Sequence, residues 1–352
     1  MAPIGIAIIG GGIFVKEEHL PAALSSPLLA IKAIWSRSLK SAQDTANLIP
    51  GDYSTSVDLY STDSGEGKSY DDLLKRADIK GVIIALPIPD QSEYTEKALA
   101  AGKHVLAEKP IAKDVASALK LIEYYKKVSG ENGATLAIAE NFRFTDGYTH
   151  GAEEVKNLGR VTGFIVRINL LMKQSNKYYQ TAWRQKPEFQ GGFLLDAGVH
   201  FTAALRKLLG EGNTVESVIA QTSLASSYLP QVDSINAVLK LKSGAVGSFI
   251  VSFGNLMQAF EFHVACEQGL VKAESNKVVV TKGADESATT EEKAWERTSG
   301  VKNEVHAWAE GLASGTPNLA QSPEQALADL ELLEKMLKSG DSDGARQVLE
   351  YQ

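Results

Sequence analysis

The sequence has only one cysteine, Cys266, among its 352 residues. A single cysteine excludes an intrachain disulfide framework and any zinc cluster built from cysteines. It is typical of a protein kept in a reducing compartment, so we expect a cytoplasmic protein. The opening residues, MAPIGIAIIGGG, contain no basic stretch ahead of the apolar run. We therefore expect no signal peptide.

Long apolar runs and an excess of positive charge are also missing. No run approaches the roughly 20 residues that a membrane-spanning helix needs, so we expect no membrane partner. The net charge is −7, whereas nucleic-acid-binding proteins present a basic surface, so we expect no nucleic-acid partner. Hydrophobic residues make up 44% and charged residues 22% of the chain. This composition is that of a globular protein, and its length suggests about two domains.

Short apolar segments alternate with helical patterns in the N-terminal part of the chain. This alternation predicts a parallel sheet with right-handed helical crossovers. The sequence thus favours an α/β Rossmann domain over residues 1–142. The expected strands are 4–9, 28–35, 81–87, 104–110 and 135–141, and the expected helices are 38–49, 70–77, 92–102 and 114–130.

The pattern changes after a predicted helix at 146–158, because strand-like segments then follow one another. Several alternate apolar and polar residues, which predicts a large, mostly antiparallel open sheet with one covered face. We expect an α+β domain over residues 143–352. Segment 61–69 of the first domain and segment 283–292 of the second are expected to be solvated loops. The expected strands are 163–172, 215–224, 234–242, 245–253, 259–267, 270–274 and 277–282, and the expected helices are 193–209, 303–314 and 323–338.

A glycine-rich loop follows the first predicted strand. Gly10 and Gly12 occupy the first two glycine positions of G-x-G-x-x-G, and Val15 stands at the third. The first glycine permits a tight turn, and the second lets a pyrophosphate approach the backbone at a helix N-terminus. The alternative is an ordinary strand-to-helix turn, but the strand, loop, helix and strand order favours dinucleotide binding.

The end of the second predicted strand reads SRSLK at residues 36–40. An NAD site usually has an acid there for the ribose 2′-hydroxyl, but no acid occurs before Asp44. Ser36, Arg37 and Lys40 instead supply a hydroxyl and two cations, which suit a 2′-phosphate. We therefore expect NADP(H) rather than NAD(H). The alternative is that Arg37 is a solvated loop residue.

Three motifs occur together in the chain: GGGIFVKEEHLPA at 10–22, AEKPIA at 107–112 and YYQTAWRQKPEFQGGFLLDAGVH at 178–200. With this set the chain resembles the Gfo/Idh/MocA oxidoreductases over nearly its whole length, and it looks most similar to their fungal NADPH-dependent branch. The resemblance implies a Rossmann domain, a C-terminal α+β domain and hydride transfer. It also implies a cofactor site made by Gly10, Gly12, Ile13, Phe14, Ser36, Arg37, Lys40, Leu86, Pro87, Gln91, Glu108, Lys109 and Asn141.

The same resemblance implies that Lys109, Asp196 and His200 are the catalytic residues. Residues four apart share one face of a helix, so Asp196 and His200 can point the same way. A lysine can stabilise the oxygen of a carbonyl as hydride arrives, and a histidine can protonate it. Asp196 would orient the two. The alternatives are a surface lysine and a helix-face ion pair; we expect no metal.

Some residues depart from the family pattern or face the substrate. Ile88 and Gln91 stand where many relatives have asparagine and histidine, so that wall of the cofactor site is altered. Trp183 and Arg184 are expected beside the substrate, together with Asp196 and His200, and an arginine there suits an oxygen-rich ligand. The alternative for Trp183 is a packing role. The remaining histidines are expected to be structural or exposed: His19, His104, His150, His263 and His306.

We therefore expect an NADP(H)-dependent enzyme that moves a hydride between nicotinamide and a carbonyl or alcohol carbon. The substrate would be a sugar, a polyol or a related small carbonyl compound. The alternatives are a non-catalytic NADP-binding regulator of the repressor type, or a reductase of the same fold that acts on an imine or a dihydrodiol. The resemblance also implies a homo-oligomer, and we expect a dimer rather than a tetramer.

Overall fold

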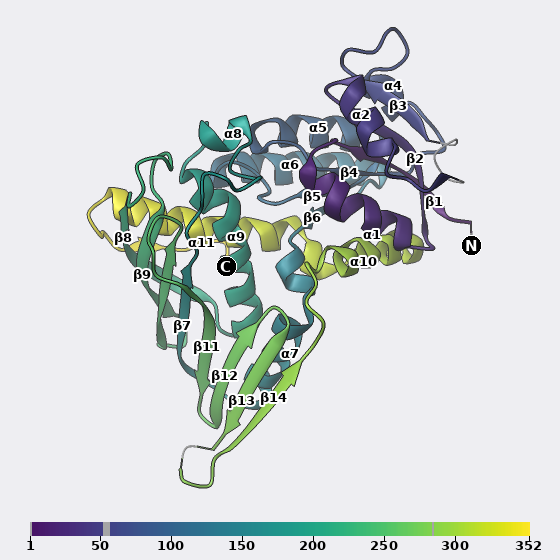
Figure 1. Ribbon diagram of the computed structural model, residues 1–352. Coiled ribbons are helices and arrows are strands. Elements are labelled where there is room, and N and C mark those ends of the chain that lie inside the picture. The colour runs from purple at the N-terminus through teal and green to yellow at the C-terminus, as the bar shows by residue number, and fades with distance from the viewer. Residues whose placement is uncertain (1, 52–56, 284) are drawn as a thin grey trace. The chain divides into compact units, whose positions relative to one another are not determined.

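The computed structural model describes residues 2–51, 57–283 and 285–352 (Figure 1). The chain divides into two compact units. The first comprises the residues up to Glu140 together with Val301–Ala326, and the second comprises Asn141–Gly300 together with Leu327–Gln352. This division differs from a single boundary after residue 142, because segment 301–326 returns to the first unit. Among the helices of the described residues, none has both the length and the apolarity to cross a membrane.

Within the described residues the first unit has a six-stranded sheet in the order β3-β2-β1-β4-β5-β6, and all of its strand pairs are parallel. The predicted parallel sheet is thus confirmed. Strand β3 was not predicted, because it is a four-residue edge strand without a periodic apolar pattern. The strands are β1 (Ile4–Ile9), β2 (Leu29–Ser36), β3 (Asp58–Ser61), β4 (Gly81–Ile84), β5 (His104–Glu108) and β6 (Leu136–Ala139).

The helices of the first unit largely match the predicted ones. Helix α5 begins at Ile88, earlier than expected, because the prolines of LPIPDQ occupy its N-cap and first turn, where no backbone N–H is needed. The elements are the π-helical turn η1 (Val15–His19), α1 (Leu20–Ser25), α2 (Leu39–Ala46), α4 (Tyr70–Leu74), α5 (Ile88–Ala100), α6 (Val115–Asn132), α10 (Val301–Ser314) and the 3-10 turn η3 (Leu319–Gln321).

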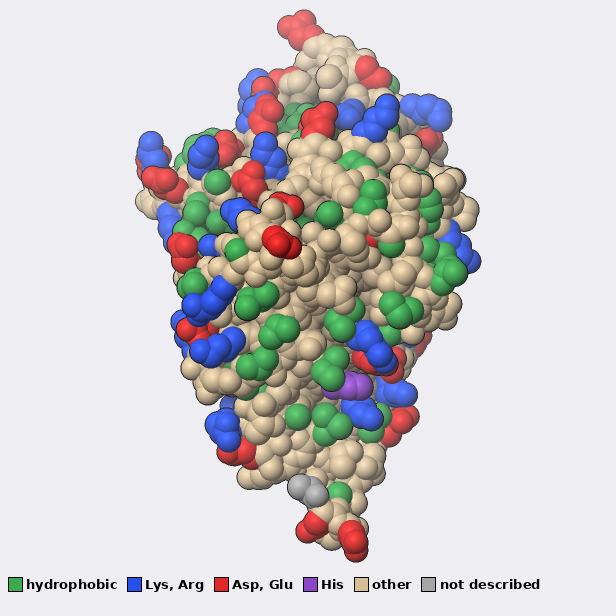
Figure 2. All heavy atoms as spheres, turned by 90° about the vertical axis from the view of Figure 1, so that its left-hand side faces the viewer, with side chains coloured by type: hydrophobic (Ala, Val, Ile, Leu, Met, Phe, Trp, Pro, Cys, Tyr) green, Lys and Arg blue, Asp and Glu red, His purple; other side chains and the backbone are tan. Residues whose placement is uncertain are grey.

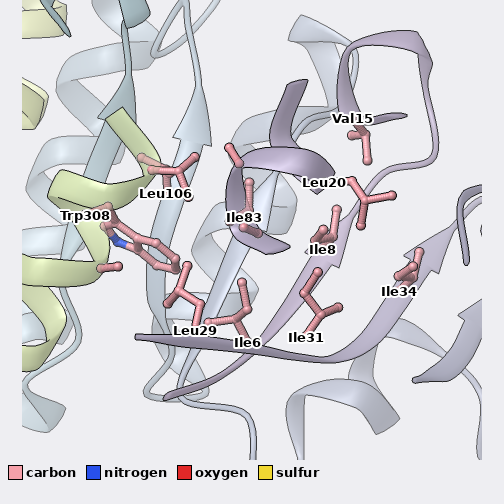
Figure 3. Packing of buried hydrophobic residues seen from close by; sticks show 14 of the residues in the cluster. Ile6, Ile8, Val15, Leu20, Leu29, Ile31, Ile34, Ile83, Leu106 and Trp308 are labelled. Atoms are coloured by element: carbon pink, nitrogen blue, oxygen red, sulfur yellow. The ribbon is translucent and has the colours of Figure 1, made fainter. Parts of the chain in front are cut away.

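A hydrophobic core fills the space between β1, β2 and the helices after the glycine loop (Figure 3). Ile6, Ile8 and Ile34 are fully buried in it, and Val15 and Leu20 bring η1 and α1 onto the sheet. Trp308 joins the same cluster from α10. The burial of this apolar face is the physical reason why α10, far away in sequence, belongs to the first unit.

The second unit has a nine-stranded sheet, counted over the described residues, in the order β14-β13-β12-β11-β7-β10-β9-β8-β15. Its pairs are antiparallel except β7 with β10, which confirms a mostly antiparallel sheet. The strands are β7 (Val161–Asn169), β8 (Val215–Ser223), β9 (Ser234–Leu241), β10 (Val246–Ser252), β11 (Ala259–Cys266), β12 (Gly269–Glu274), β13 (Lys277–Lys282), β14 (Thr289–Ala294) and β15 (Gln347–Val348).

Strand β14 corrects the expectation of a loop at 283–292, within which residue 284 lies outside the described residues. Every residue of its segment TTEEKA is exposed, so the strand shows no apolar alternation that could reveal it. It exists because it pairs with β13 along its whole length. Long-range backbone hydrogen bonding therefore decides the structure at this edge, and local side-chain pattern does not.

Helix α9 (Gly192–Leu209) carries the predicted Asp/His pair of the second unit. The chain enters it through Gly191 and Gly192, whose φ angles of +71° and +48° favour glycine. Gly198 packs α9 closely on the last helix, because a Cβ there would lie 2.9 Å from Cδ2 of Leu333. The other helices of this unit are η2 (Asn141–Phe144), α7 (Asp146–Asn157), α8 (Ala182–Gln185) and α11 (Pro323–Asp341), whose first turn belongs to the first unit.

Candidate active site

The glycine loop lies at the carboxyl end of β1, where the strand order of the sheet reverses between β2 and β4. Gly10 has a φ of +128°, and a Cβ there would lie 2.4 Å from the carbonyl oxygen of Ala85. Only glycine fits this turn. At Gly12, by contrast, a Cβ would meet no atom within 4 Å. Backbone is therefore exposed to an approaching ligand at Gly12, as a dinucleotide site requires.

The residues after the glycines begin a helical segment. Ile13 and Phe14 are half-buried and lead directly into η1, so their backbone belongs to a helix N-terminus that attracts an anion. Val15, at the third glycine position, is 1% exposed and packs into the core. Its Cγ2 lies 3.5 Å from where a Cβ of Gly10 would be. Close packing of the helix on the strand is thus kept despite the missing glycine.

The end of β2 has the chemistry that the sequence suggested. Ser36 is buried, and its hydroxyl lies 3.2 Å from where a Cβ of Gly11 would be, so it borders the glycine loop. Arg37 and Lys40 are exposed, and Lys40 lies 3.6 Å from Asp44. Two side chains in this region can therefore place positive charge near a ligand phosphate.

An acid that the sequence did not point to lies beside this region. Asp63 accepts hydrogen bonds from the Leu39 N–H at 2.6 Å and from the Ser61 hydroxyl at 2.6 Å. These two contacts, the hydroxyl first, lower the pKa of the Asp63 carboxyl. The first backbone amide of α2 is thus already bonded within the protein.

Lys109 follows β5 at the same carboxyl edge of the sheet and is half-buried. Its N–H donates to the carbonyl of Ala139 at 3.2 Å and to Oε2 of Glu108 at 3.1 Å. The peptide bond from Lys109 to Pro110 is cis. The Lys109 N–H is therefore shared between two acceptors, one on β6 and one at the end of β5.

Gln91, one of the two departures from the family pattern, bonds the backbone of the two residues that flank Lys109. It is 2% exposed, and its Nε2 donates to the carbonyl oxygens of Glu108 and Pro110, the latter at 3.2 Å. Ile88 is also buried, whereas Leu86 and Pro87 are half-buried in the segment between β4 and α5. The first unit thus gathers most of the predicted cofactor residues at one edge of one sheet.

Asp196 and His200 lie one turn apart on α9. Asp196 is 5% exposed, and its Oδ2 accepts a hydrogen bond from Nε of Arg184 at 2.6 Å. The ring of His200 stacks on that of Phe142, with centroids 4.6 Å apart and an interplanar angle of 17°. Each side chain of the predicted pair is therefore held by a neighbour that the sequence did not assign to it.

Arg184 also lies over two aromatic rings. Its guanidinium carbon is 4.0 Å from the ring centroid of Trp183 and 5.5 Å from that of Tyr178. Such cation–π contacts restrict the side chain beyond its ion pair with Asp196. Trp183 therefore has a packing role toward Arg184, and Tyr178 was missed because the sequence offered only the pair YY without a periodic pattern.

Asn141 and Arg143 lie in η2, at the start of the second unit. Asn141 donates from Nδ2 to the carbonyl of Ser299 at 2.5 Å. Arg143 pairs with Asp329, which is 2% exposed and also binds Nη1 of Arg206 at 2.7 Å. The Arg143 side chain therefore belongs to a buried ion network within this unit.

The sequence did not identify two further residues of the first unit, His19 and Glu304, as candidate site residues. His19 is fully buried, and its Nε2 donates to Oε1 of Glu108 at 2.6 Å. Glu304 on α10 is fully buried as well. A signal for Glu304 was present, because it falls on the helix face otherwise occupied by Val301, Val305 and Trp308. An acid on an apolar helix face calls for a partner or a function.

Comparison with family models identifies both parts of the chain. Residues 4–131 match an oxidoreductase family with an NAD-binding Rossmann fold. Residues 153–346 match the C-terminal alpha/beta domain of the same oxidoreductase family.

Individual relatives match over different lengths. Dehydrogenase FPY6 of Fusarium mangiferae is 37% identical over 354 residues, which cover 99% of this chain and 100% of that protein. A dTDP-3,4-didehydro-2,6-dideoxy-alpha-D-glucose 3-reductase of Streptomyces violaceoruber is 30% identical over 61% of this chain and 57% of its own. The crystal structure of an oxidoreductase from Thermotoga maritima superimposes with a TM-score of 0.84 at 31% identity, covering 98% of each chain.

Proposed function

Because the chain belongs to the Gfo/Idh/MocA family of oxidoreductases, we propose that it is an NADP(H)-dependent enzyme that transfers hydride between nicotinamide and a carbonyl or alcohol carbon. One observation carries the proposal. Lys109 stands at the carboxyl end of β5, in the same parallel sheet whose β1 ends in the glycine loop. A cation thus lies at the sheet edge where ligands of such folds bind.

The residues at this edge fit a dinucleotide. Gly12 leaves space for a pyrophosphate, and the helix N-terminus at Ile13 and Phe14 favours its negative charge. Ser36, Arg37 and Lys40 would hold the 2′-phosphate that distinguishes NADP(H) from NAD(H). When bound, the cofactor supplies or accepts the hydride. The remaining predicted contacts are Leu86, Pro87, Gln91, Glu108, Lys109 and Asn141.

The chemistry left to the protein is to stabilise charge and to move a proton. We assign to the Lys109 ammonium the stabilisation of negative charge on the substrate oxygen. His200 donates a proton to that oxygen, or accepts it in the reverse direction. Asp196, fixed by Arg184, sets the electrostatic field at the adjacent turn of α9. Phe142 holds the His200 ring in one orientation.

The substrate class in this proposal is a sugar, a polyol or a related small carbonyl compound. The name of the Streptomyces violaceoruber relative describes reduction of a deoxysugar nucleotide. The aromatic rings of Trp183 and Tyr178 and the guanidinium of Arg184 provide a partly apolar, partly polar surface that suits an oxygen-rich ligand.

A substrate screen tests this function. Aldehydes, ketoses, keto sugars and polyols are mixed with the full chain and with either NADPH and NADH or their oxidised forms, and absorbance is followed at 340 nm. We expect turnover with at least one carbonyl or alcohol compound and a preference for NADP(H). NADPH binding without turnover of any compound would instead favour the alternative function, a non-catalytic NADP-binding regulator. Turnover confined to imines or dihydrodiols would contradict the assigned reaction.

Substitution of Gly12 by alanine tests whether this residue is needed for cofactor binding rather than for the stability of the fold. Because a Cβ there meets no atom within 4 Å, the free energy of unfolding of the ligand-free protein should change by less than about 1 kcal/mol. The methyl group would nevertheless stand between the backbone and the pyrophosphate, so the Kd for NADPH, measured by fluorescence titration, should rise at least about tenfold. The control is Gly130→Ala on α6, where a Cβ is equally unobstructed. Equal NADPH affinities in both variants would contradict the proposed pyrophosphate site at Gly12.

We also propose that the chain forms a homodimer through the sheet of the second unit. On the face of the sheet away from its buried side chains, Ile165, Ile219 and Val238 are 45%, 48% and 50% exposed. The register places them in one row, from Ile219 on β8 through Val238 and Ser248 to Ile165 on β7. Figure 2, which views the side where β8 and β9 lie in Figure 1, shows hydrophobic side chains among charged ones on this face.

An arginine in this row tests the dimer. Val238→Arg places a charge where a partner would bury it, which is costly without a counter-ion. Light scattering at micromolar concentration should give twice 37.8 kDa for the wild type and 37.8 kDa for the variant. Thr290→Arg, on exposed edge strand β14 of the same sheet, should keep the wild-type mass. A wild-type protein of 37.8 kDa would contradict the proposal.

A further inference from the structure

The Arg184 guanidinium is held in place by four neighbouring side chains of the second unit. Its Nε donates to Oδ2 of Asp196 at 2.6 Å, and its Nη1 donates to the Thr181 hydroxyl at 3.3 Å. That hydroxyl in turn donates to the carbonyl of Tyr178 at 2.7 Å, which leaves its oxygen to accept from the arginine. The guanidinium also lies over the rings of Trp183 and Tyr178. The Arg184 side chain therefore has a fixed position and orientation.

Part of this guanidinium remains available to a ligand. A guanidinium has five N–H donors. Nε and Nη1 of Arg184 each use one of them in the two bonds above, which leaves three, and Nη2 has no hydrogen-bond partner among the described residues. Because these donors are coplanar and already fixed, little conformational entropy is lost when they bind oxygen atoms. Arg184 is therefore prepared to bind an oxygen-rich ligand beside Asp196.

The charge of Asp196 decides which oxygen-rich ligands the arginine favours. The buried carboxylate lies 2.6 Å from Nε of Arg184, so the pair as a whole is neutral. A hydroxyl group can bind the remaining N–H groups regardless of this balance, because it carries no charge. A carboxylate is attracted by the guanidinium but repelled by Asp196, so the two Coulomb energies largely cancel. The loss of its hydration is then poorly compensated.

We propose that the Arg184–Asp196 pair determines specificity by selecting uncharged sugars and polyols over the corresponding sugar acids. The inference rests on the proposed function, because it requires the substrate to lie at α9 beside His200, the proposed proton donor. His200 is one turn beyond Asp196 on the same face of this helix. The rings of Trp183 and Tyr178 add apolar surface without a further charge.

Two substrates that differ in one group test this selectivity. The best neutral substrate of the screen is compared with its acid analogue, in which a terminal CH₂OH is replaced by a carboxylate. We expect kcat/KM of the wild type to favour the neutral compound at least about tenfold. An equal or greater kcat/KM for the acid would overturn the inference and leave the proposed function intact. No turnover of any carbonyl or alcohol compound would overturn the proposed function itself.

Asp196→Asn tests whether the aspartate disfavours the acid. Asparagine keeps the shape and an oxygen that accepts from Nε of Arg184, but it removes the opposing charge. The ratio of kcat/KM for the acid to that for the neutral substrate should rise at least about tenfold, because the guanidinium charge is no longer balanced. This ratio cancels any loss of kcat that is common to both substrates. Where the acid is not turned over, its competitive inhibition constant against the neutral substrate replaces its kcat/KM.

The control for net charge is Glu188→Gln, which removes an exposed acid of the same unit and should keep the wild-type ratio. An unchanged ratio in Asp196→Asn, or the same rise in both variants, would contradict the proposal.

The double variant Arg184→Met/Asp196→Asn shows whether the arginine binds the acid. No cation then remains at this position, so the effect of Asp196→Asn should disappear and the ratio should return to the wild-type value or below. The double variant is preferred to Arg184→Met alone, which would leave the buried Asp196 charge without this ion pair and destabilise the fold. Urea unfolding confirms that each variant is folded. A ratio as high as that of Asp196→Asn would show that Arg184 does not bind the acid, and the proposal would be wrong.

Discussion

Replacement of His200 by alanine should lower kcat by about 10²- to 10⁴-fold, the range for removal of a general acid or base. His200 shares a face of α9 with Asp196, and its ring is fixed against Phe142. The loss should appear in the chemical step, as a primary isotope effect with deuterated NADPH in stopped-flow or steady-state assays. The Kd for NADPH should hardly change, because the proton is given to the substrate.

Lys109→Ala should lower kcat by a similar factor, because it removes the cation that stabilises the substrate oxygen. Its Kd for NADPH is a less clean measure, since Lys109 is also a predicted cofactor contact. The control is Lys113→Ala, an exposed lysine of the same segment, which should keep the wild-type kcat. If His200→Ala retains a near-normal kcat while chemistry is rate-limiting, the proton donor is another residue and the assignment of His200 is wrong.

Arg37→Ala should abolish most of the preference for NADPH over NADH. A charged hydrogen bond to the 2′-phosphate contributes on the order of 1.5–3 kcal/mol, which corresponds to roughly a 10- to 150-fold loss in NADPH affinity. NADH affinity should stay within a few-fold, because NADH has no group for the guanidinium to bind. The preference should also weaken with salt, since Arg37 is exposed and its charge is screened.

Titration of both cofactors against the wild type and Arg37→Ala measures this effect. Lys120→Ala, which removes an exposed charge on α6, should leave the preference intact and controls for net charge. Equal affinity of the wild-type protein for NADPH and NADH would contradict the expected specificity. A large loss for both cofactors in Arg37→Ala would instead indicate that Arg37 maintains the local structure.

The fold could be predicted wherever the physical reason for an element is local. Apolar runs such as 4–9 and 81–87 indicate strands buried on both faces, and the structure has strands at Ile4–Ile9 and Gly81–Ile84. Strand β14 could not be predicted, because its exposed sequence carries no pattern and only pairing with β13 defines it. That α10 belongs to the first unit could not be predicted either, since the helix α1 that it contacts lies hundreds of residues earlier in the sequence.

Site residues could be predicted where they belong to a sequence motif, but the residues that contact them could not be predicted. The glycine loop and Lys109 stand on one sheet edge because parallel strands end together. No spacing rule connects Arg184 to Asp196 or Phe142 to His200, because these contacts arise from tertiary packing. Gln91 was expected to alter the cofactor wall, and the structure gives it a buried role in bonding the carbonyls beside Lys109.

The most direct test of hydride transfer follows a deuterium atom. The enzyme is supplied with NADPH deuterated at the transferable C4 position and with the best carbonyl substrate from the screen, and the product is analysed by mass spectrometry and NMR. We predict a product that carries one deuterium on the former carbonyl carbon, formed far more slowly by His200→Ala and Lys109→Ala. A product without deuterium, or one formed equally fast by both variants, would contradict the central claim.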